Sequence, residues 1–407
     1  MAPSRATRRT ALGAALALAA GSLVAGGVAT AASHSAGTPS CGALFDDFAY
    51  ASSSDPGFTG NGWSARSTAG GPGVPGATWS PGNITFPTVD GQKVAQLAAS
   101  TDGTASGTTQ AEFLQTRLRF FEGTYASRIK FHDVPASGPD GDHVNETFFT
   151  IGPPQRFDYD PLYSELDFSE YLPNGGWGVT GSIDYQTSWN GYKEDPWDPH
   201  NAHSQEATSF DGWHDVVSQV AGGHVKYYMD GVLVGDHTVD DKTGTYPVYP
   251  RVPMSLNYNL WFIDTAAHTG GVSTYDEQVD WVYYAKNTVL SPADAVSRAA
   301  TYRSTGTSHE DTLDASSCPD PITPPTTAPP TTAPSTVPPT TPADCSHASE
   351  WSAAATYNTG DRVVHERSVN GDPNGPKAGG KHLWQANWWT QGSEPGWTAQ
   401  WRDLGHC

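Results

Sequence analysis

The chain has 407 residues and a formal net charge of −21 at pH 7, and only 16% of its residues are Asp, Glu, Lys or Arg. It offers no basic stripe of the kind that phosphate binding needs, which argues against a nucleic-acid partner. Its 43 Gly, 32 Pro, 14 Trp and 17 Tyr fit turn-rich β structure with aromatic surfaces, and a neutral, hydroxylated polymer suits such a chain best as a partner.

Residues 1–32 have the pattern of an export signal. Three arginines precede a run of small and apolar residues, and Ala29-Thr30-Ala31 forms a small-residue cleavage site. The pair Arg8-Arg9 resembles a twin-arginine signal. No later run reaches the ~18 apolar residues that a membrane span needs. We therefore expect a secreted, extracellular protein without membrane contact after processing.

Short β-like runs alternate with clusters of Gly, Pro, Asn and Asp between residues 41 and 290, and hardly any segment has a helical period. The clearest runs are 124–131, 148–151, 225–229, 254–260 and 278–284. Such spacing favours an antiparallel β-sandwich over alternating β-α units. Residues 291–302 look helical, because Ser291 can cap a helix and Pro292 suits its first turn.

The densest group of acids within an apolar run lies at residues 165–170, Glu-Leu-Asp-Phe-Ser-Glu. Side chains alternate along a β-strand, so Glu165 and Asp167 share one face while Leu166 and Phe168 can enter a core. Strict alternation would turn Glu170 away from the first two acids. A β-bulge, in which two residues occupy one position, returns Glu170 to their face.

Three carboxylates on one strand face raise one another's proton affinity, an environment that can separate an ionised nucleophile from a protonated acid. Cutting a glycosidic bond needs an acid that protonates the leaving oxygen and a second carboxylate that attacks the sugar or activates water. Glu165 and Glu170 can take these two parts, and Asp167 can orient the attacking glutamate. The alternative interpretation is an exposed polar strand face.

The sequence around the hexapeptide favours the catalytic interpretation. Residues 44–286 resemble glycoside hydrolase family 16, because five landmarks stand around the acids in family order: 121–125 (FEGTY), 147–150 (TFFT), 211–214 (DGWH), 228–231 (YMDG) and 279–283 (VDWVY). The resemblance implies a β jelly roll with a sugar cleft across its concave sheet and a retaining mechanism. It also implies that Glu165 is the nucleophile, Asp167 its helper and Glu170 the acid/base. The spacing of the acids is similar to the bulged form of the family motif, common in β-1,3-glucanases and some galactan hydrolases.

One departure from the family pattern bears on the substrate. Laminarinase-like members commonly carry Trp-Pro and a Gly shortly before the first glutamate, whereas residues 161–164 read Pro-Leu-Tyr-Ser. We expect an endo-glycosidase that hydrolyses internal β-glucan linkages, and β-1,3 is the linkage that we favour. The alternatives are a mixed-linkage β-1,3-1,4-glucanase, a galactan hydrolase, a transglycosylase and a non-catalytic lectin.

Aromatic residues after the hexapeptide are candidates for binding the sugar. Trp177, Tyr185, Trp189 and Trp197 lie in Gly/Asn-rich sequence, where an aromatic face can stack on a sugar ring or pack in a core. His214 is a further candidate for the cleft, with a structural histidine as the alternative.

The expected reaction requires no cofactor. Two features of the sequence nevertheless bear on cofactor binding. Asp280 matches a position that in some family members helps to hold a structural calcium ion, and a satisfied surface carboxylate is the alternative. Residues 71–76 satisfy the pattern Gly-x-Gly-x-x-Gly, but their prolines and the missing strand-then-helix context argue against a dinucleotide site.

Residues 319–343 form a Pro/Thr tract that we interpret as an extended linker. It separates a catalytic domain, 33–318, from residues 344–407, which hold six tryptophans. This last segment resembles the family 5/12 carbohydrate-binding module, the chitin-binding type. The resemblance implies a small β module that binds a chitin-like polymer through Trp388 and Trp389, with Trp384 or Tyr357 as a further platform residue.

The four cysteines permit three pairings. Pairing Cys41 with Cys318 and Cys345 with Cys407 keeps each disulfide inside one domain, as an oxidising exterior favours, and reduced cysteines are the alternative. A chitin-type module beside a glucanase makes sense where chitin and β-1,3-glucan occur together, as in fungal cell walls. We expect a monomer.

Overall fold

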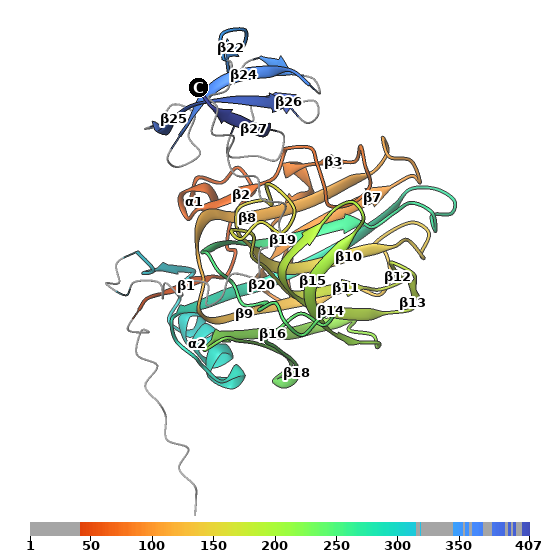
Figure 1. The fold of residues 1–407 in the computed structure, drawn as a ribbon. Coiled ribbons are helices and arrows are strands. Elements are labelled where there is room, and N and C mark those ends of the chain that lie inside the picture. The colour runs from red at the N-terminus through yellow and green to blue at the C-terminus, as the bar shows by residue number, and fades with distance from the viewer. Residues whose placement is uncertain are drawn as a thin grey trace, which may run out of the picture. The chain divides into compact units, whose positions relative to one another are not determined.

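The computed structural model describes residues 41–314, 318, 345–352, 355–357, 360–368, 377–386, 390–391, 394–395 and 401–407 (Figure 1). The signal-like segment and the linker lie outside these residues. Within the described part, no helix is both long and apolar enough to cross a membrane.

Between residues 43 and 311 the regular structure consists mainly of β-strands, nearly all of them paired antiparallel, which confirms the expected all-β sandwich (Figure 1). We call one of its two sheets the front sheet. Its strands lie in the order β2 (Trp63–Ala65), β8 (Thr109–Phe120), β19 (Met254–Phe262), β10 (Val144–Ile151), β11 (Glu165–Leu172), β14 (Ile183–Lys193) and β15 (Asp198–Glu206).

The back sheet runs in the order β18 (Val232–His237), β17 (His224–Met229), β16 (Gly212–Ala221), β9 (Gly123–Phe131) and β20 (Ser273–Lys286). Beyond β20, β7 (Ala95–Thr101) pairs with its first half and β1 (Ala43–Asp46) with its second half. The outermost strands are β4 (Ile84–Thr85), next to β7, and β21 (His309–Asp311), next to β1. Because β8 also pairs with β3 (Thr78–Trp79) and β7, the two sheets join at one edge.

The main core lies between the two sheets and is lined by large apolar side chains from both. Those with at most 1% of their surface exposed include Phe113, Phe148, Leu166, Phe168 and Tyr258 from the front sheet and Tyr125, Ile129, Val225, Tyr227 and Val282 from the back sheet. Leu166 and Phe168 thus enter the core, as the alternation of the hexapeptide predicts.

The helix α2 (Pro292–Ser304) packs on the other face of the back sheet (Figure 1). The Ser291 side chain accepts a hydrogen bond from the backbone N–H of Asp294 (3.1 Å), which confirms the expected helix start. Phe45 of β1 stacks on Tyr302 of the helix with ring centroids 4.8 Å apart. The remaining short elements are α1 (Pro56–Gly60), the 3-10 turn η1 (Pro81–Asn83), and the hairpin pairs β5 (Thr88–Val89) with β6 (Gln92–Lys93) and β12 (Gly175–Gly176) with β13 (Val179–Thr180).

The C-terminal segment has sheets of its own. One contains β22 (Ser349–Glu350), β24 (Arg362–Ser368), β25 (Lys377–Ala386) and β27 (Trp401–His406), and the other pairs β23 (Thr356–Tyr357) with β26 (Thr390–Gln391). Among the described residues, none of these strands pairs with a strand of 43–311. The domain boundaries at 318 and 344 stay predictions.

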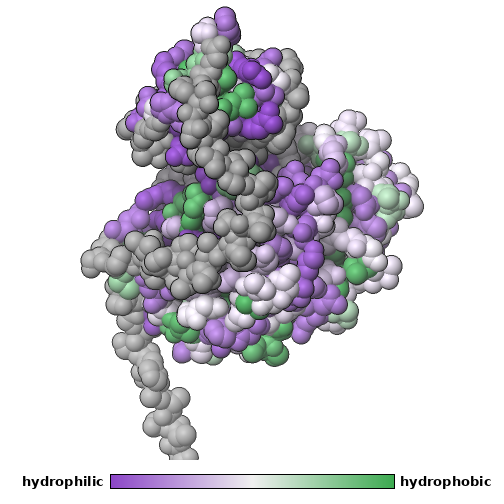
Figure 2. Space-filling view, viewed as in Figure 1, coloured by the Kyte–Doolittle hydropathy of each residue, from purple (hydrophilic) through white to green (hydrophobic). Residues whose placement is uncertain are grey.

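Both expected disulfides are present, Cys41 with Cys318 and Cys345 with Cys407. On the face drawn in Figure 2, hydrophilic residues surround small separate groups of apolar residues among the coloured, described part of the chain.

Candidate active site

The hexapeptide forms the start of β11, and the pairing of this strand contains a bulge. Against β10, Asp167 lies opposite Phe149 and Ser169 opposite Phe148, so Phe168 is an extra residue. Against β14, Asp167 lies opposite Thr187 and Glu170 opposite Tyr185, so β11 advances by three residues where β14 advances by two. The extra residue that the sequence analysis placed between the acids is therefore confirmed.

A cleft of about 1220 Å³ lies on the outer face of the front sheet, and the bulge decides which acids enter it. On the other strands the cleft is lined by every second residue, as the pleat requires. These residues are Glu112, Leu114, Thr116 and Leu118 on β8, Thr147, Phe149 and Ile151 on β10, Tyr185, Thr187 and Trp189 on β14, Asn201 and His203 on β15, and Ser255, Asn257, Asn259 and Trp261 on β19. Only β11 breaks the alternation, so Glu165, Asp167 and Glu170 all line the cleft.

Burial perturbs all three carboxyl groups. Burial first, and then the charge of Glu170, raise the pKa of Glu165 to about 8. Burial and the charges of both glutamates raise the pKa of Asp167 well above its usual value, and the hydrogen bond that the Trp189 indole donates to it (2.9 Å) offsets part of this. Burial also raises the pKa of Glu170. The cluster therefore retains protons at a pH where exposed carboxyls are ionised.

Two side chains that the sequence analysis missed donate hydrogen bonds to Glu170. They are Asn145 Nδ2 on β10 (3.1 Å to Oε1) and Thr187 Oγ1 on β14 (3.1 Å to Oε2). Both hydrogen bonds lower the pKa of Glu170 against the larger effect of burial. Alternation along 145–149 could have placed Asn145 on the cleft side of its strand, but only the register between strands brings it to Glu170.

The structure places Trp177, Tyr185, Trp189 and Trp197 in the cleft wall, while their contact with a sugar stays a prediction. Trp177 is 52% exposed, and its ring centroid lies 6.3 Å from that of Tyr185. Its φ of +50° is a conformation that bulky residues rarely adopt, in the turn between β12 and β13. Such strain is commonly kept at functional sites.

Polar and aromatic residues of β19 and β8 were also missed. Trp261 lies 6.0 Å from Trp177 between ring centroids, and Asn257 and Asn259 line the cleft beside it. Glu112 forms an ion pair with Arg66 (2.8 Å) at the cleft wall. The run 254–260 was interpreted only as a strand, although its alternating asparagines carried a signal for a polar face.

His214 was a candidate for the cleft, with a structural histidine as the alternative, and the assignment to the cleft was wrong. It lies on β16 of the back sheet and does not line the cleft. Its Nδ1 is 2.7 Å from Asp230 Oδ2, so the histidine has the structural role that was its alternative.

Asp280 does not have the surroundings expected of a calcium ligand. Arg303 Nη2 donates to its Oδ1 (2.5 Å) and Nη1 to its Oδ2 (2.9 Å), so a guanidinium already faces both carboxylate oxygens. No group of three or more His, Cys, Asp or Glu side chains that could hold a metal ion occurs in the described part of the chain.

In the C-terminal segment, Trp384 was a candidate platform residue, and its position contradicts that role. It is 8% exposed in a small core with Val363, Ala386 and Trp401, and its indole donates to the backbone oxygen of His365 (3.1 Å). Tyr357 packs against the same core and is partly exposed. The expected binding pair Trp388 and Trp389 lies outside the described residues.

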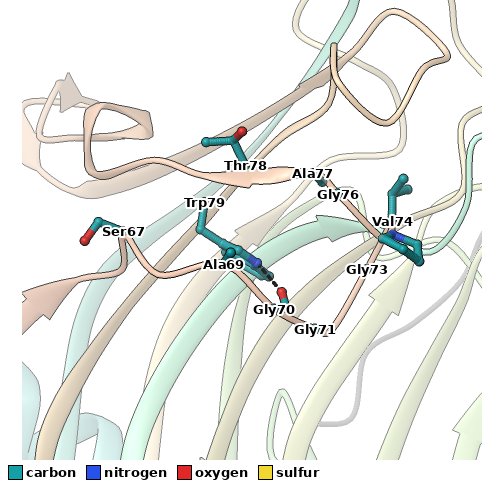
Figure 3. A pocket seen from close by; sticks show the side chains of 11 residues that line it. Ser67, Ala69, Gly70, Gly71, Gly73, Val74, Gly76, Ala77, Thr78 and Trp79 are labelled. Atoms are coloured by element: carbon teal, nitrogen blue, oxygen red, sulfur yellow. Dashed lines mark hydrogen bonds between the residues drawn. The ribbon is translucent and has the colours of Figure 1, made fainter. Parts of the chain in front are cut away.

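A second hollow of about 490 Å³ lies at the loop 67–79 (Figure 3). Glycine, alanine, Val74, Pro75 and Trp79 make up most of its lining, and Trp79 Nε1 donates to the Gly70 oxygen (2.8 Å). No titratable side chain lines this hollow, so we assign it no chemistry.

No protein-family model matches the chain. The endo-1,3-1,4-beta-glycanase ExoK of Rhizobium meliloti (strain 1021) is 30% identical to it over 179 residues, which cover 42% of this chain and 56% of that protein. The chain thus spans about half the length of the curated relative that it matches.

Similar solved structures are the Bacillus licheniformis beta-glucanase and a prokaryotic beta-1,3-1,4-glucanase (lichenase) derived from a mouse hindgut metagenome. The first is 19% identical with a TM-score of 0.43, and the match covers 60% of this chain and 98% of that chain. The second is 20% identical with a TM-score of 0.41, again over 60% and 98%.

Proposed function

We propose that the chain is a retaining endo-β-glucanase of the glycoside hydrolase family 16 type. The observation that carries the proposal is the β11 bulge, which aligns Glu165, Asp167 and Glu170 in one cleft. The motif that these acids form, and the name of the Rhizobium meliloti relative, support the same reaction class.

In the proposed reaction, the ionised fraction of Glu165 attacks the anomeric carbon while protonated Glu170 gives its proton to the glycosidic oxygen. The bond between carbon and leaving oxygen breaks, and its electron pair stays on that oxygen. Water then attacks the glycosyl ester on Glu165, Glu170 accepts the proton of the water, and the carboxylate of Glu165 leaves. Asp167, held by the Trp189 indole, orients Glu165 and influences its proton affinity, since the charges of the two carboxyl groups interact.

The dimensions of the cleft favour attack within a polymer. It crosses six strands from β8 to β15, a width of about 24 Å at ~4.8 Å per strand spacing. Several sugar rings fit such a length, with Trp177 and Trp189 in its walls.

The proposed linkage is β-1,3, as the bulged spacing of the acids favours. The second candidate is a mixed-linkage β-1,3-1,4-glucan, which the name of the relative favours. Initial rates on laminarin, lichenan, agarose and chitin separate these two candidates from a galactan hydrolase. Longer products in the presence of sugar acceptors would identify a transglycosylase.

The roles of the two glutamates are tested by azide rescue on an aryl β-laminaribioside. We expect Glu165→Gln to abolish turnover. Azide should restore turnover in both alanine variants, with different products. Glu165→Ala should give the α-glycosyl azide, because azide replaces the missing nucleophile. Glu170→Ala should give the β-glycosyl azide, because azide attacks the glycosyl ester on Glu165. The exposed Glu194→Ala is the control. Undiminished turnover in the Glu165 variants would refute the mechanism.

We further propose that the protein is secreted, acts on fungal cell walls, and is held there by the chitin-type module. Trp388→Ala with Trp389→Ala should lower the rate on fungal walls and leave the rate on soluble laminarin unchanged. A double variant that keeps the wild-type rate on fungal walls as well as on laminarin would remove the basis of this proposal.

A further inference from the structure

Glu170 differs from the other two acids of the cleft in the hydrogen bonds that its carboxyl group accepts. Its two oxygens accept hydrogen bonds from opposite neighbouring strands, one from Asn145 on β10 and one from Thr187 on β14, each at 3.1 Å. Among the described residues, none donates a hydrogen bond to the Glu165 carboxyl, and Asp167 accepts one, from Trp189.

We propose that Asn145 and Thr187 are positioning residues that clamp the Glu170 carboxyl from both sides and set the pH at which it releases its proton. The proposal deepens the proposed function, because it rests on Glu170 as the acid/base of that reaction.

The burial of Asn145 lowers the stability of the fold, which suggests that this side chain is kept for its contact with Glu170. It is 0% exposed, and its Oδ1 is buried without a hydrogen-bond partner in the described structure. A buried acceptor left unpaired costs stability. The other end of the side chain, Nδ2, donates a hydrogen bond to Glu170. Because an amide nitrogen can only donate, Asn145 favours the ionised form of Glu170.

Thr187 differs from Asn145 because a hydroxyl both donates and accepts. It can donate to the Glu170 carboxylate and, after rotation of its hydrogen, accept from the protonated acid. An acid/base alternates between these two states in each catalytic cycle. Thr187 can therefore hold Glu170 in one position throughout the cycle, while Asn145 opposes excessive proton affinity.

The ionisable groups around Glu170 act against the clamp. They are Glu165 and Asp167 on its own strand, Asp184 and Tyr185 on β14, and Tyr227 from the back sheet. Burial raises the pKa of Glu170, and the two donated hydrogen bonds lower it. Removing one donor should therefore raise the pKa of Glu170 further.

The test compares Thr187→Val with two controls in the full-length protein. Thr187→Ser keeps the hydroxyl, and Thr150→Val removes a hydroxyl that is equally buried but has no hydrogen-bond partner. The profile of kcat/KM against pH on laminarin is measured for each variant, and near-UV circular dichroism verifies the fold.

We expect the basic limb of the Thr187→Val profile to move up by about one to two pH units, the shift that corresponds to one lost hydrogen bond to a charged group. Both controls should keep the wild-type limb. An unchanged basic limb in folded Thr187→Val would overturn the proposal. A shift of the acidic limb instead would mean that Glu170 must be ionised to react, which contradicts its role as the acid.

A second measurement does not depend on activity. The carboxyl carbon of Glu170 is titrated by NMR in protein labelled with ¹³C at the Glu side chains, with Glu170→Gln for assignment. A higher titration point in Thr187→Val supports the clamp even in a protein that cleaves no β-glucan, and an unchanged titration point refutes it. Lack of cleavage with a shifted titration would therefore count against the proposed function alone.

Discussion

Glu277 gives the sharpest prediction about stability, because it is a carboxyl group buried without support. It lies on β20, is 0% exposed, and neither of its oxygens has a hydrogen-bond partner of ordinary geometry. Burial raises its pKa well above the usual value, and the backbone N–H of Thr147 offsets only part of that effect. Glu146 of β10, also fully buried, has a raised pKa because of burial and the charge of Glu277.

The sign of the pH dependence follows from the raised pKa. A carboxyl with a raised pKa in the folded state contributes its full stability below the unfolded pKa of 4.5, and this stability is lost as pH rises towards the folded pKa. Each pH unit costs about 1.36 kcal/mol while Glu277 keeps its proton, so the loss between pH 4.5 and pH 7 is at most about 3 kcal/mol.

Glu277→Gln removes this loss while keeping the size and polarity of the side chain. We expect the variant and the wild type to have the same free energy of unfolding near pH 4. At pH 7 the variant should be more stable than the wild type, by at most about 3 kcal/mol. Urea titrations followed by tryptophan fluorescence at pH 4, 5.5 and 7 measure the difference.

The exposed Glu194→Gln is the matched control and should follow the wild type at every pH. A Glu277→Gln variant whose stability runs parallel to that of the wild type from pH 4 to pH 7 would refute the reasoning. Such a result would mean that Glu277 is ionised, and stabilised, in the folded protein.

Three further substitutions have defined outcomes. Trp189→Phe should lower kcat/KM on laminarin by roughly 10-fold, because Asp167 loses the indole hydrogen bond, and an unchanged value would show that this bond does not matter. Trp177→Ala should raise KM by roughly 5-fold to 10-fold with little change in kcat or melting temperature, since the side chain is half exposed; a lower kcat at constant KM would contradict a binding role. Arg303→Met should destabilise the fold by about 2 kcal/mol in thermal unfolding, because Asp280 then keeps only Arg128, 3.9 Å away, as its cationic partner, and recovery on adding calcium would instead support a metal at Asp280.

The acids of the cleft could be predicted because their signal is local. Alternation along β11 assigns Leu166 and Phe168 to the core, and the count of residues between Asp167 and Glu170 requires one bulge. Both facts can be read from six consecutive residues.

The supports of these acids could not be predicted in the same way. Asn145 and Thr187 reach Glu170 only through the registers of β10 and β14 against β11, and a register depends on residues far apart in the sequence. The same holds for Trp261, which meets Trp177 from a strand that lies 84 residues further along the chain by numbering.

The errors also have a physical cause. The sequence around His214 was recognised only as a family landmark, and a local motif does not say which of two sheets its strand joins. For Trp384 the difficulty is burial, since a small module needs large side chains for its core and an aromatic residue serves a core or a surface equally well.

The disulfide between Cys41 and Cys318 has a mechanical consequence. It joins the two chain segments that flank β1 and β21, and these strands also pair with each other, Leu44 lying opposite Asp311. A tensile load that enters the chain beyond Cys318 is carried by a covalent bond to Cys41, so β21 is not pulled away from β1 one hydrogen bond at a time. Reduction of the disulfide should therefore let a pull from beyond Cys318 unravel the sandwich from β21, its outermost strand on this side.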